Sequence, residues 1–449
     1  MSNLIQKYNV PGPRYTAYPT VPFWKNADLK QEDWVESIHT NFKFFNSNEI
    51  SIYIHLPFCE SLCTFCGCHK RITKNHAVES PYIDAVIQEW KIYLSVIDFK
   101  PVIRELHLGG GTPTFFQPSE LKRMLETIFE QSEIHPTKHE FSFEAHPNNT
   151  TEEHLQTLFD LGFRRLSLGI QDYSPEVQKA IHRIQSFEQV ERVHKKAQEI
   201  GYTSISHDLV FGLPKQLLSD IEDTVVKTLL LMPDRISLYS YAHVPWVKGV
   251  GQRGFDENDL PKNEEKRALY ENAKLTLEKA GYLEIGMDHF ALPHDNLSIA
   301  LKNKKLHRNF MGYTTQNTSM MIGLGMSSIS DSWFGFAQNE KTVEEYIARV
   351  EKNEIPVFKG HLLTEEELVI RKNILDLMCH FETRVDNELF LTEIQEHLSE
   401  MIQDGLVEIN GQVVQITDAG IPFVRNACMA FDLDLQGIEK REGLFSKTV

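Results

Sequence analysis

From about residue 50 to residue 290, short runs of β-forming residues alternate with amphipathic helical patterns. The β-rich runs lie at residues 51–56, 103–108, 140–145, 165–169, 204–210 and 235–240. This alternation predicts repeated βα units whose strands form a parallel sheet. Six strands that run in one direction predict either a barrel or an open wound sheet.

Polar residues and glycines stand where these predicted strands end. They are Gly109-Gly110-Gly111-Thr112, Glu144, Gln171, Asp208 and Tyr241-Ala242-His243. In barrel enzymes the C-terminal ends of the strands carry the active site. Each of these residues, taken alone, also fits a turn or a helix cap. Their recurrence at one strand after another predicts that they face a common mouth.

Four cysteines, Cys59, Cys63, Cys66 and Cys68, follow the first predicted strand within ten positions. Three thiolates at the spacing C-x3-C-x2-C can hold three irons of a 4Fe-4S cubane and leave the fourth iron open to another ligand. Cys68 is a less suitable fourth ligand, because one residue beyond Cys66 it has little freedom to reach a different iron. We therefore predict Cys59, Cys63 and Cys66 as the metal ligands.

Other cysteine sites fit this spacing less well. A structural zinc site usually brings two separated ligand pairs, whereas the only further cysteines, Cys379 and Cys428, are isolated in the sequence. A ferredoxin uses four cysteines per cluster, typically in a C-x2-C-x2-C-x3-C run. A disulfide scaffold requires a shorter chain that is richer in cysteine. The pattern favours a cluster with a reactive iron.

Composition narrows the partners of the chain. Its 449 residues carry a formal charge of -17, which disfavours non-specific binding to nucleic acid. No stretch approaches the roughly 18 apolar residues of a membrane span, and the first residues contain no apolar signal region. We expect a cytoplasmic enzyme, in a compartment where thiolates stay reduced. An acidic substrate would need a local basic pocket.

The chain divides into three expected parts: an N-terminal extension at 1–48, a catalytic barrel at 49–342 and a C-terminal domain at 343–449. The last part reads as helical and then as two alternating strands around Asn410-Gly411, which predicts a hairpin and a winged-helix-like module. Residues 341–449 carry 21 acidic and 11 basic residues, which argues against a DNA-binding wing and favours a lid over the substrate. Residues 14–20 form either a mobile cap or an ordered tail packed on the barrel.

Several long motifs resemble one enzyme family. They are Gly12-Pro-Arg-Tyr-Thr-Ala-Tyr-Pro-Thr20, His55-Leu-Pro-Phe-Cys59, Gly109-Gly-Gly-Thr-Pro113, Leu168-Gly-Ile-Gln-Asp172, Asp208-Leu-Val-Phe-Gly-Leu-Pro-Lys215, Gly286-Met-Asp-His-Phe290, His307-Arg-Asn-Phe310 and Gly312-Tyr-Thr-Thr315. Over nearly the whole chain the sequence resembles radical S-adenosylmethionine (SAM) enzymes, and among them the oxygen-independent coproporphyrinogen III oxidases (dehydrogenases). This resemblance implies an α/β fold, a partial (β/α)6 TIM-like radical SAM barrel.

The resemblance also implies a reaction. A 4Fe-4S cluster and SAM would generate a 5′-deoxyadenosyl radical, which takes a hydrogen atom from the β-carbon of a propionate of coproporphyrinogen III. Loss of carbon dioxide and one electron leaves a vinyl group, and two such events give protoporphyrinogen IX in haem biosynthesis. A flavodoxin or ferredoxin would donate the electron that the cluster needs. Nothing in the sequence demands a dimer, so we expect a monomer.

By the same resemblance, the first SAM contacts Tyr53, Phe65, Gly110, Glu144 and Ile329. A second SAM beside it contacts Gly111, Thr112, Gln171, Arg183, Asp208 and Ala242. The residues expected to take part in catalysis are Tyr53, Glu144, Asp208 and Phe310. Gly110 and Gly111 either let the backbone approach the ligand or form a plain tight turn. Because buried carboxylates need partners, we expect the substrate to meet Arg14, Lys215 and Arg308.

Some residues depart from the family or separate it from its relatives. A related haem-binding chaperone usually has Cys-Asp where this chain has Cys66-Gly67-Cys68, so Cys68 favours the oxidase. The family usually has glutamine at Met311, and Val-Asp at Ala145-His146. The alternatives are a haem-binding protein and a radical SAM methyltransferase or ring-opening enzyme acting on tetrapyrroles. Cys379 reads as an ordinary buried thiol.

Overall fold

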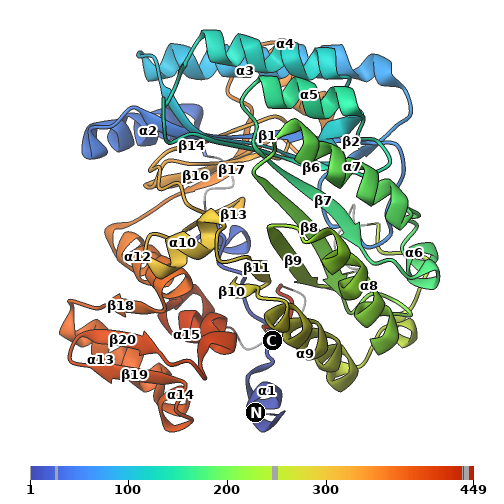
Figure 1. Ribbon diagram of the computed structural model, residues 1–449. Coiled ribbons are helices and arrows are strands. Elements are labelled where there is room, and N and C mark those ends of the chain that lie inside the picture. Colours follow the sequence, from blue (N-terminus) through green and yellow to red (C-terminus); the bar gives the residue numbers. More distant parts are fainter. Residues whose placement is uncertain (1, 26–28, 245–250, 437, 439–443, 449) are drawn as a thin grey trace.

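The computed structural model describes residues 2–25, 29–244, 251–436, 438 and 444–448 (Figure 1). At its centre six strands lie side by side in chain order, each parallel to the next. They are β1 (Glu49–Leu56), β4 (Val102–Gly110), β6 (Glu140–Ala145), β7 (Arg165–Gln171), β8 (Ser204–Phe211) and β9 (Arg235–Ser240). All six predicted strands are therefore confirmed, and their C-terminal ends share one edge.

The sheet continues beyond both ends of this parallel core. Next to β1 lie β14 (Met321–Leu324), β15 (Ile329–Asp331), β16 (Gly335–Asn339) and β17 (Val357–Leu362), and next to β9 lie β11 (His289–Ala291) and β10 (Leu283–Gly286). In the described part of the chain the two outermost strands, β10 and β17, do not pair with each other. The sheet therefore curves as a partial barrel that stays open on one side, as predicted.

Helices cover the outer face of the parallel strands (Figure 1). They are α3 (Glu79–Ile97), α4 (Pro118–Glu130), α5 (Glu152–Asp160), α7 (Phe187–Ile200), α8 (Leu218–Leu231) and α9 (Asn263–Lys279). On α4, Leu121, Met124, Leu125 and Ile128 recur at helical spacing and are fully buried. Each such side chain contributes about 1.5–3 kcal/mol by leaving water, so the apolar stripe fixes which face of α4 meets the sheet. A Leu125→Ala change would cost about 2–5 kcal/mol.

The C-terminal part combines helices with a small sheet. Its helices are α12 (Glu365–His380), α13 (Glu388–His397), α14 (Ser399–Gln403) and α15 (Val424–Phe431). The predicted hairpin is present as β19 (Val407–Asn410) and β20 (Val413–Ile416), with β18 (Glu382–Arg384) paired to β20. Gly411 in its turn has φ 61°, a conformation that glycine adopts without strain.

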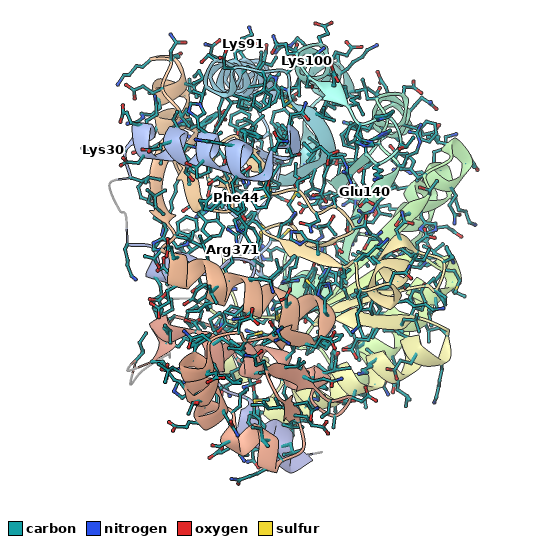
Figure 2. The ribbon with its side chains drawn as sticks, turned by 90° about the vertical axis from the view of Figure 1, so that its left-hand side faces the viewer. Lys30, Phe44, Lys91, Lys100, Glu140 and Arg371 are labelled. Atoms are coloured by element: carbon teal, nitrogen blue, oxygen red, sulfur yellow. The ribbon has the colours of Figure 1, made fainter. Side chains whose placement is uncertain are left out.

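The border of this part lies later in the chain than the predicted residue 343. Residues 343–362 form α11 (Val343–Val350), which packs on α3, and β17, which pairs with β16. This pairing satisfies the backbone edge of β16, and that edge holds the segment on the barrel side. The C-terminal part is tied to the same layer by Arg371 of α12, labelled in Figure 2. Its guanidinium donates 2.7 Å to the Trp333 carbonyl and pairs with Asp331 at 2.5 Å.

The N-terminal extension is an ordered tail. Helix α1 (Ser2–Tyr8) lies near the C-terminal end of the chain (Figure 1), and Pro11 forms a β-bridge with Lys447. Tyr15 is buried, and its hydroxyl donates to Asp432 at 2.9 Å. Helix α2 (Gln31–Phe45) then packs against β16, β17 and α3. Of the two arrangements considered for residues 14–20, the structure therefore has the packed one.

Candidate active site

The cysteine loop leaves the barrel at the C-terminal end of β1. Cys59, Cys63 and Cys66 are half-buried, Cys68 is exposed, and none is in a disulfide. Backbone hydrogen bonds fix the loop, from Arg71 to the Pro57 carbonyl at 2.9 Å and from Thr64 to the Ile181 carbonyl at 3.0 Å. The loop thus presents its thiols beside the mouth of the barrel.

Cationic and hydroxyl groups surround the thiols. Arg183 Nη1 lies 3.8 Å from Cys63 Sγ, and Thr112 Oγ1 lies 3.3 Å from Cys59 Sγ. A hydrogen bond from Cys68, helped by the charge of Lys70, lowers the pKa of Cys66. Burial raises the pKa of Cys59 to about 11. The lowered pKa of Cys66 favours its thiolate, the form in which cysteine binds metal.

This donor set fits a cubane better than a single ion. Among the described residues, no three His, Cys, Asp or Glu side chains converge where one metal ion would bind. A 4Fe-4S cluster takes each thiolate at a different iron, so its ligands need not converge on one point. Three unpaired thiols on one fixed loop, with Arg183 and Thr112 beside them, have the chemistry that such a cluster requires.

Gly110 and Gly111 bring the end of β4 close to this loop. A Cβ at Gly110, where φ is 111°, would lie 2.7 Å from the His55 ring, and a Cβ at Gly111 would lie 2.5 Å from the Pro57 carbonyl oxygen. The Gly111 N–H donates to the Leu56 carbonyl at 2.9 Å. A side chain at either position would therefore collide with β1 or with the loop that follows it. The sequence interpretations considered only approach to a ligand or a tight turn, and neither included this contact.

Tyr53, Glu144, Gly110 and Phe310, which lie far apart in the sequence, meet above β1 and β4. The ring of Phe310 lies 5.8 Å from that of Tyr53, edge to face. Glu144 Oε2 accepts from the Gly110 N–H at 3.2 Å. Burial, with the nearby charge of Glu144, raises the pKa of Tyr53, so the phenol keeps its proton. This group combines an apolar wall with a half-buried carboxylate.

Two histidines belong to this group, although the sequence interpretation missed them. His107 stacks on Tyr53 at 6.1 Å, and its Nε2 lies 3.6 Å from Glu144 Oε1. His55 Nδ1 lies 3.0 Å from the Tyr53 hydroxyl, and burial lowers the pKa of His55 to about 4, which keeps the ring neutral. Residues 53, 55, 107 and 109 alternate along two paired strands with Tyr53 opposite His107. Side chains two positions apart on a strand face the same side of the sheet, and this alternation is the sequence signal from which both histidines could have been predicted.

Gln171 ends β7 and Ala242 follows β9, whereas Asp208 lies inside β8, which continues to Phe211, and not at the strand end where it was predicted. Asp208 Oδ2 accepts from Ser167 Oγ at 2.6 Å, and burial raises the pKa of Asp208 to about 6. Arg183 Nη2 donates to the Gly169 carbonyl at 2.5 Å. Gln171, the last residue of β7, has φ 69°. The predicted residues of a second ligand therefore share the mouth with the cysteine loop.

Phe65 and Ala242 are joined by a hydrogen-bonding side chain. Gln252 Nε2 donates to the Ala242 carbonyl at 2.8 Å and to the Phe65 carbonyl at 3.4 Å. The cysteine loop is thereby tied to the segment after β9.

Ile329 stands one strand further from the mouth. It is buried on β15 with Trp24 and Phe336, and Phe310 packs against this cluster. Its carbonyl backs Gly323 of β14, which pairs with Tyr53. Ile329 therefore reaches the site at the side of Phe310 and Tyr53.

A cavity of ≈ 120 Å³ runs down the barrel interior from this group. Its lining includes His107, Glu144, Asp208, Asn309 and Met311. Met311, which stands where the family usually has glutamine, thus faces this cavity. His146 lies beside Arg183, whose charge, together with burial, lowers the pKa of His146.

The cationic side chains that were expected to meet the substrate lie in different parts of the structure. Arg308 is buried and donates to the Arg14 carbonyl at 3.4 Å, so these two lie together. Lys215 is exposed in the turn after β8, where its N–H donates to the Asp259 carbonyl, and it lines neither described cavity. The expectation that Lys215 meets the substrate is therefore not supported, because the turn directs it to solvent.

Comparison with known proteins places this geometry in a family. Residues 53–227 match the Radical SAM superfamily. The oxygen-independent coproporphyrinogen III oxidase of Helicobacter pylori is 38% identical over 99% of this chain and 98% of its own, and that of Escherichia coli is 35% identical over 96% and 95%. The chain belongs to the oxygen-independent coproporphyrinogen III oxidase family. A solved structure of the E. coli coproporphyrinogen III oxidase, described as a radical SAM enzyme, matches with a TM-score of 0.90 and 32% identity over 97% of this chain and 99% of that one.

Membership of this radical SAM family accounts for the cysteine loop: the enzyme uses a 4Fe-4S cluster and SAM. None of the helices that the structure describes combines the length and apolar character needed to cross a bilayer.

Proposed function

We propose that this enzyme converts two propionates of coproporphyrinogen III to vinyl groups without oxygen, giving protoporphyrinogen IX. The observation that carries the proposal is the full-length agreement with the oxidase family, together with a cysteine loop at the mouth of the barrel. When bound, the cluster and SAM supply a 5′-deoxyadenosyl radical. The residues of this chain bind, orient and shield the reacting groups.

Cys59, Cys63 and Cys66 hold the cluster in this proposal, and Arg183 balances the negative charge of its thiolates from 3.8 Å. Cys68 is not assigned as an iron ligand. Its exposed thiol sets the low pKa of Cys66 through the hydrogen bond between them.

The first SAM lies against Tyr53, Phe65, Gly110, Glu144 and Ile329. One oxygen of Glu144 accepts from Gly110, and the carboxylate, which is half-buried, has further lone pairs for the ammonium or ribose hydroxyls of the ligand. Tyr53 and Phe310 form an aromatic wall beside it. This wall excludes water from the carbon that gives up its hydrogen atom.

The second SAM lies against Gly111, Thr112, Gln171, Arg183, Asp208 and Ala242. Arg183 supplies a guanidinium for a carboxylate, and Asp208 supplies a carboxylate for an ammonium or hydroxyl group. Arg183 contacts the Gly169 carbonyl near the end of β7, and Asp208 lines the barrel cavity from within β8. Tyr53, Glu144, Asp208 and Phe310 are the proposed catalytic residues.

The enzyme is further proposed to act as a cytoplasmic monomer that takes its electron from a flavodoxin or ferredoxin. The exposed rim of the cysteine loop includes Leu62, Arg71, Ile72 and Lys74, an apolar and basic surface in a chain of charge -17. Such a rim suits a small acidic electron carrier, because opposite charges speed and orient encounter.

Anaerobic reconstitution with iron and sulfide tests the proposed reaction. The protein is then given SAM, a strong reductant and coproporphyrinogen III, and porphyrins are analysed after oxidation. We expect protoporphyrin and about two carbon dioxide molecules per product, as the proposed reaction requires. A Cys63→Ala variant loses both iron and product, whereas Cys379→Ala, which removes a buried thiol outside the cysteine loop, keeps the iron and the product. An intact cluster that yields methylated porphyrin, or only bound haem, would overturn the proposal.

A further inference from the structure

Four cationic side chains gather where the N-terminal tail, α9, the strand β12 (His307–Asn309) and α15 meet. We call Arg14, Lys266, Arg308 and Arg425 the basic junction. Arg308 and Arg425 are 7% and 6% exposed. Burial, and after it the nearby charge of Arg308, lowers the pKa of Arg14. The rest of the chain is strongly acidic, so this concentration of positive charge is local.

Three members of the basic junction meet neutral oxygens instead of carboxylates. Lys266 Nζ donates to the Tyr241 carbonyl at 2.7 Å, and Arg308 donates to the Arg14 carbonyl at 3.4 Å. Arg425 donates to backbone carbonyls only. Among the described residues, no Asp or Glu forms an ion pair with any of these three, while Arg14 pairs with Asp288. Three positive charges are thus left without a matching negative charge.

Arg308 also holds donors that meet nothing. Its Nε and Nη1 are buried and find no hydrogen-bond partner among the residues that the structure describes. A buried guanidinium without an anion is unfavourable, since it has lost water and gained no compensating charge. Burial, with the charges of Lys447 and Arg14, lowers the pKa of Lys266 to about 8. The arrangement is unfavourable as it stands and becomes favourable when an anion enters.

The basic junction borders a cavity that opens at the mouth of the barrel. This cavity of ≈ 70 Å³ is lined by Arg14, Arg425 and Lys447, and also by Phe211 and Ser240, the last residues of β8 and β9. Glu284 lines it too, but pairs with Lys274 at 2.5 Å. On the other side, Arg308 lies over the ring of Tyr313, which lines the barrel cavity. The cations therefore stand between the site of the cofactors and the domain junction.

We infer that the basic junction binds propionate carboxylates of the porphyrinogen that are not reacting in a given turnover. The inference rests on the proposed function. The substrate has four carboxylates, and only one of them lies at the radical in a given turnover. The other three lie away from the reaction centre, and when buried they need cationic partners. Arg308 contributes N–H donors on Nε and Nη1 that no described residue accepts, each of which can donate to a carboxylate oxygen, and Lys266 contributes a point charge.

Binding of coproporphyrin III, the stable oxidised form of the substrate, tests the inference. The reconstituted holoenzyme with SAM is titrated by fluorescence. We expect Lys266→Met and Arg308→Gln each to raise the Kd by about tenfold or more, as loss of a charged hydrogen bond implies. Lys279→Met on the same helix and Arg192→Gln on α7, both exposed, are matched controls that keep the Kd within about twofold.

Two further measurements, binding of an uncharged ester and the thermal midpoint, make the outcome decisive. The tetramethyl ester of coproporphyrin III lacks the charges, so it should bind wild type and variants equally weakly. Lys266→Met should not lower the thermal midpoint, because it removes a costly buried charge, and it decides the matter if Arg308→Gln fails to fold. Wild-type affinity in Lys266→Met, or a fall in affinity for acid and ester alike, would overturn the inference.

The failure of this inference differs from the failure of the proposed function. If the wild type makes protoporphyrinogen while Lys266→Met binds coproporphyrin III normally, the carboxylate site is wrong and the reaction stands. If coproporphyrin III binding depends on Lys266 and Arg308 but no vinyl product forms, the carboxylate site stands and the reaction is wrong.

Discussion

Burial sets the protonation of the residues around the mouth. It keeps Tyr53 protonated and His55 neutral, and it raises the pKa of Asp208 to about 6. Glu144 instead is half-buried and paired with a backbone N–H. The site therefore contains two kinds of residue: neutral side chains, which pack against ligands, and carboxylates, which accept hydrogen bonds from ligands.

The Asp208 carboxylate is expected to lower the free energy of unfolding and to strengthen the binding of SAM. Its folded pKa of about 6 lies above the ordinary aspartate value of 3.8, so the native state binds more protons in that window. Stability therefore falls as the pH rises from about 4 to 6. Asp208→Asn should be more stable than wild type by about 1–3 kcal/mol at pH 8 and equal to it below pH 4. It should also bind SAM about tenfold more weakly, through loss of a charged hydrogen bond.

Guanidinium unfolding at pH 4, 6 and 8 and equilibrium dialysis with SAM measure these two effects. Asp418→Asn is the control, because Asp418 is exposed and far from the mouth in sequence. A variant that loses stability at pH 8, or that binds SAM as wild type does, would show that burial does not set the behaviour of Asp208.

At the scale of elements, one buried carboxylate joins α3 to the loop between β14 and β15. Glu89 accepts from the Gly325 N–H at 2.8 Å, from Asn339 Nδ2 at 2.6 Å and from the Tyr346 hydroxyl at 2.7 Å. On the same helix, Tyr82 donates to the His55 carbonyl at 2.8 Å. Helix α3 thereby supports the end of β1 from which the cysteine loop departs.

Removal of the Glu89 carboxylate should weaken this support. Glu89→Ala leaves the buried Gly325 N–H and Tyr346 hydroxyl without their acceptor and removes one of the acceptors of Asn339 Nδ2, so we expect a loss of at least about 2 kcal/mol. Burial raises the folded pKa of Glu89 to about 7, above the ordinary glutamate value of 4.5. The native state thus binds more protons between these values, and the advantage of Glu89 over alanine shrinks as the pH rises through them. Denaturant unfolding at pH 5 and 8 measures this, with the exposed Glu126→Ala as the control.

Elements set by local patterns were predictable, and elements set by distant pairing were not. The six parallel strands and the turn at Gly411 follow from alternation and turn chemistry within a few residues. The place of β17 in the large sheet depends on its pairing with β16, which nothing within residues 343–358 reveals. Likewise, the exposure of Lys215 depends on the turn after β8. The motifs located the site, but the contacts of His107 and Arg308 required the fold.

At the scale of the whole molecule, Arg425 joins the two ends of the chain. Its guanidinium donates to the carbonyls of Gly12, Pro13, Lys447 and Thr448 at 2.5, 2.8, 3.1 and 3.1 Å. Because it lies on α15, it fixes both terminal segments to the C-terminal part. The tail that carries Arg14 is thus held at the mouth.

Arg425→Leu should release this tail. Four buried carbonyls lose their donor, and we expect a loss of about 3–5 kcal/mol, together with faster proteolytic cleavage near residues 12–20. Arg384→Leu, in which an exposed arginine is lost from the same part of the molecule, should change stability by less than about 1 kcal/mol. Thermal unfolding and limited proteolysis measure both variants. Equal protection of the tail in Arg425→Leu would contradict this role.

Transfer of deuterium tests the central claim most directly, because it joins the cysteine loop, the mouth and the substrate in one event. Coproporphyrinogen III labelled with deuterium at the β-carbons of its propionates is turned over by the reconstituted enzyme, and 5′-deoxyadenosine is analysed by mass spectrometry. The account predicts deuterium in 5′-deoxyadenosine, with about two equivalents formed per protoporphyrinogen. Vinyl product accompanied by unlabelled 5′-deoxyadenosine would contradict it.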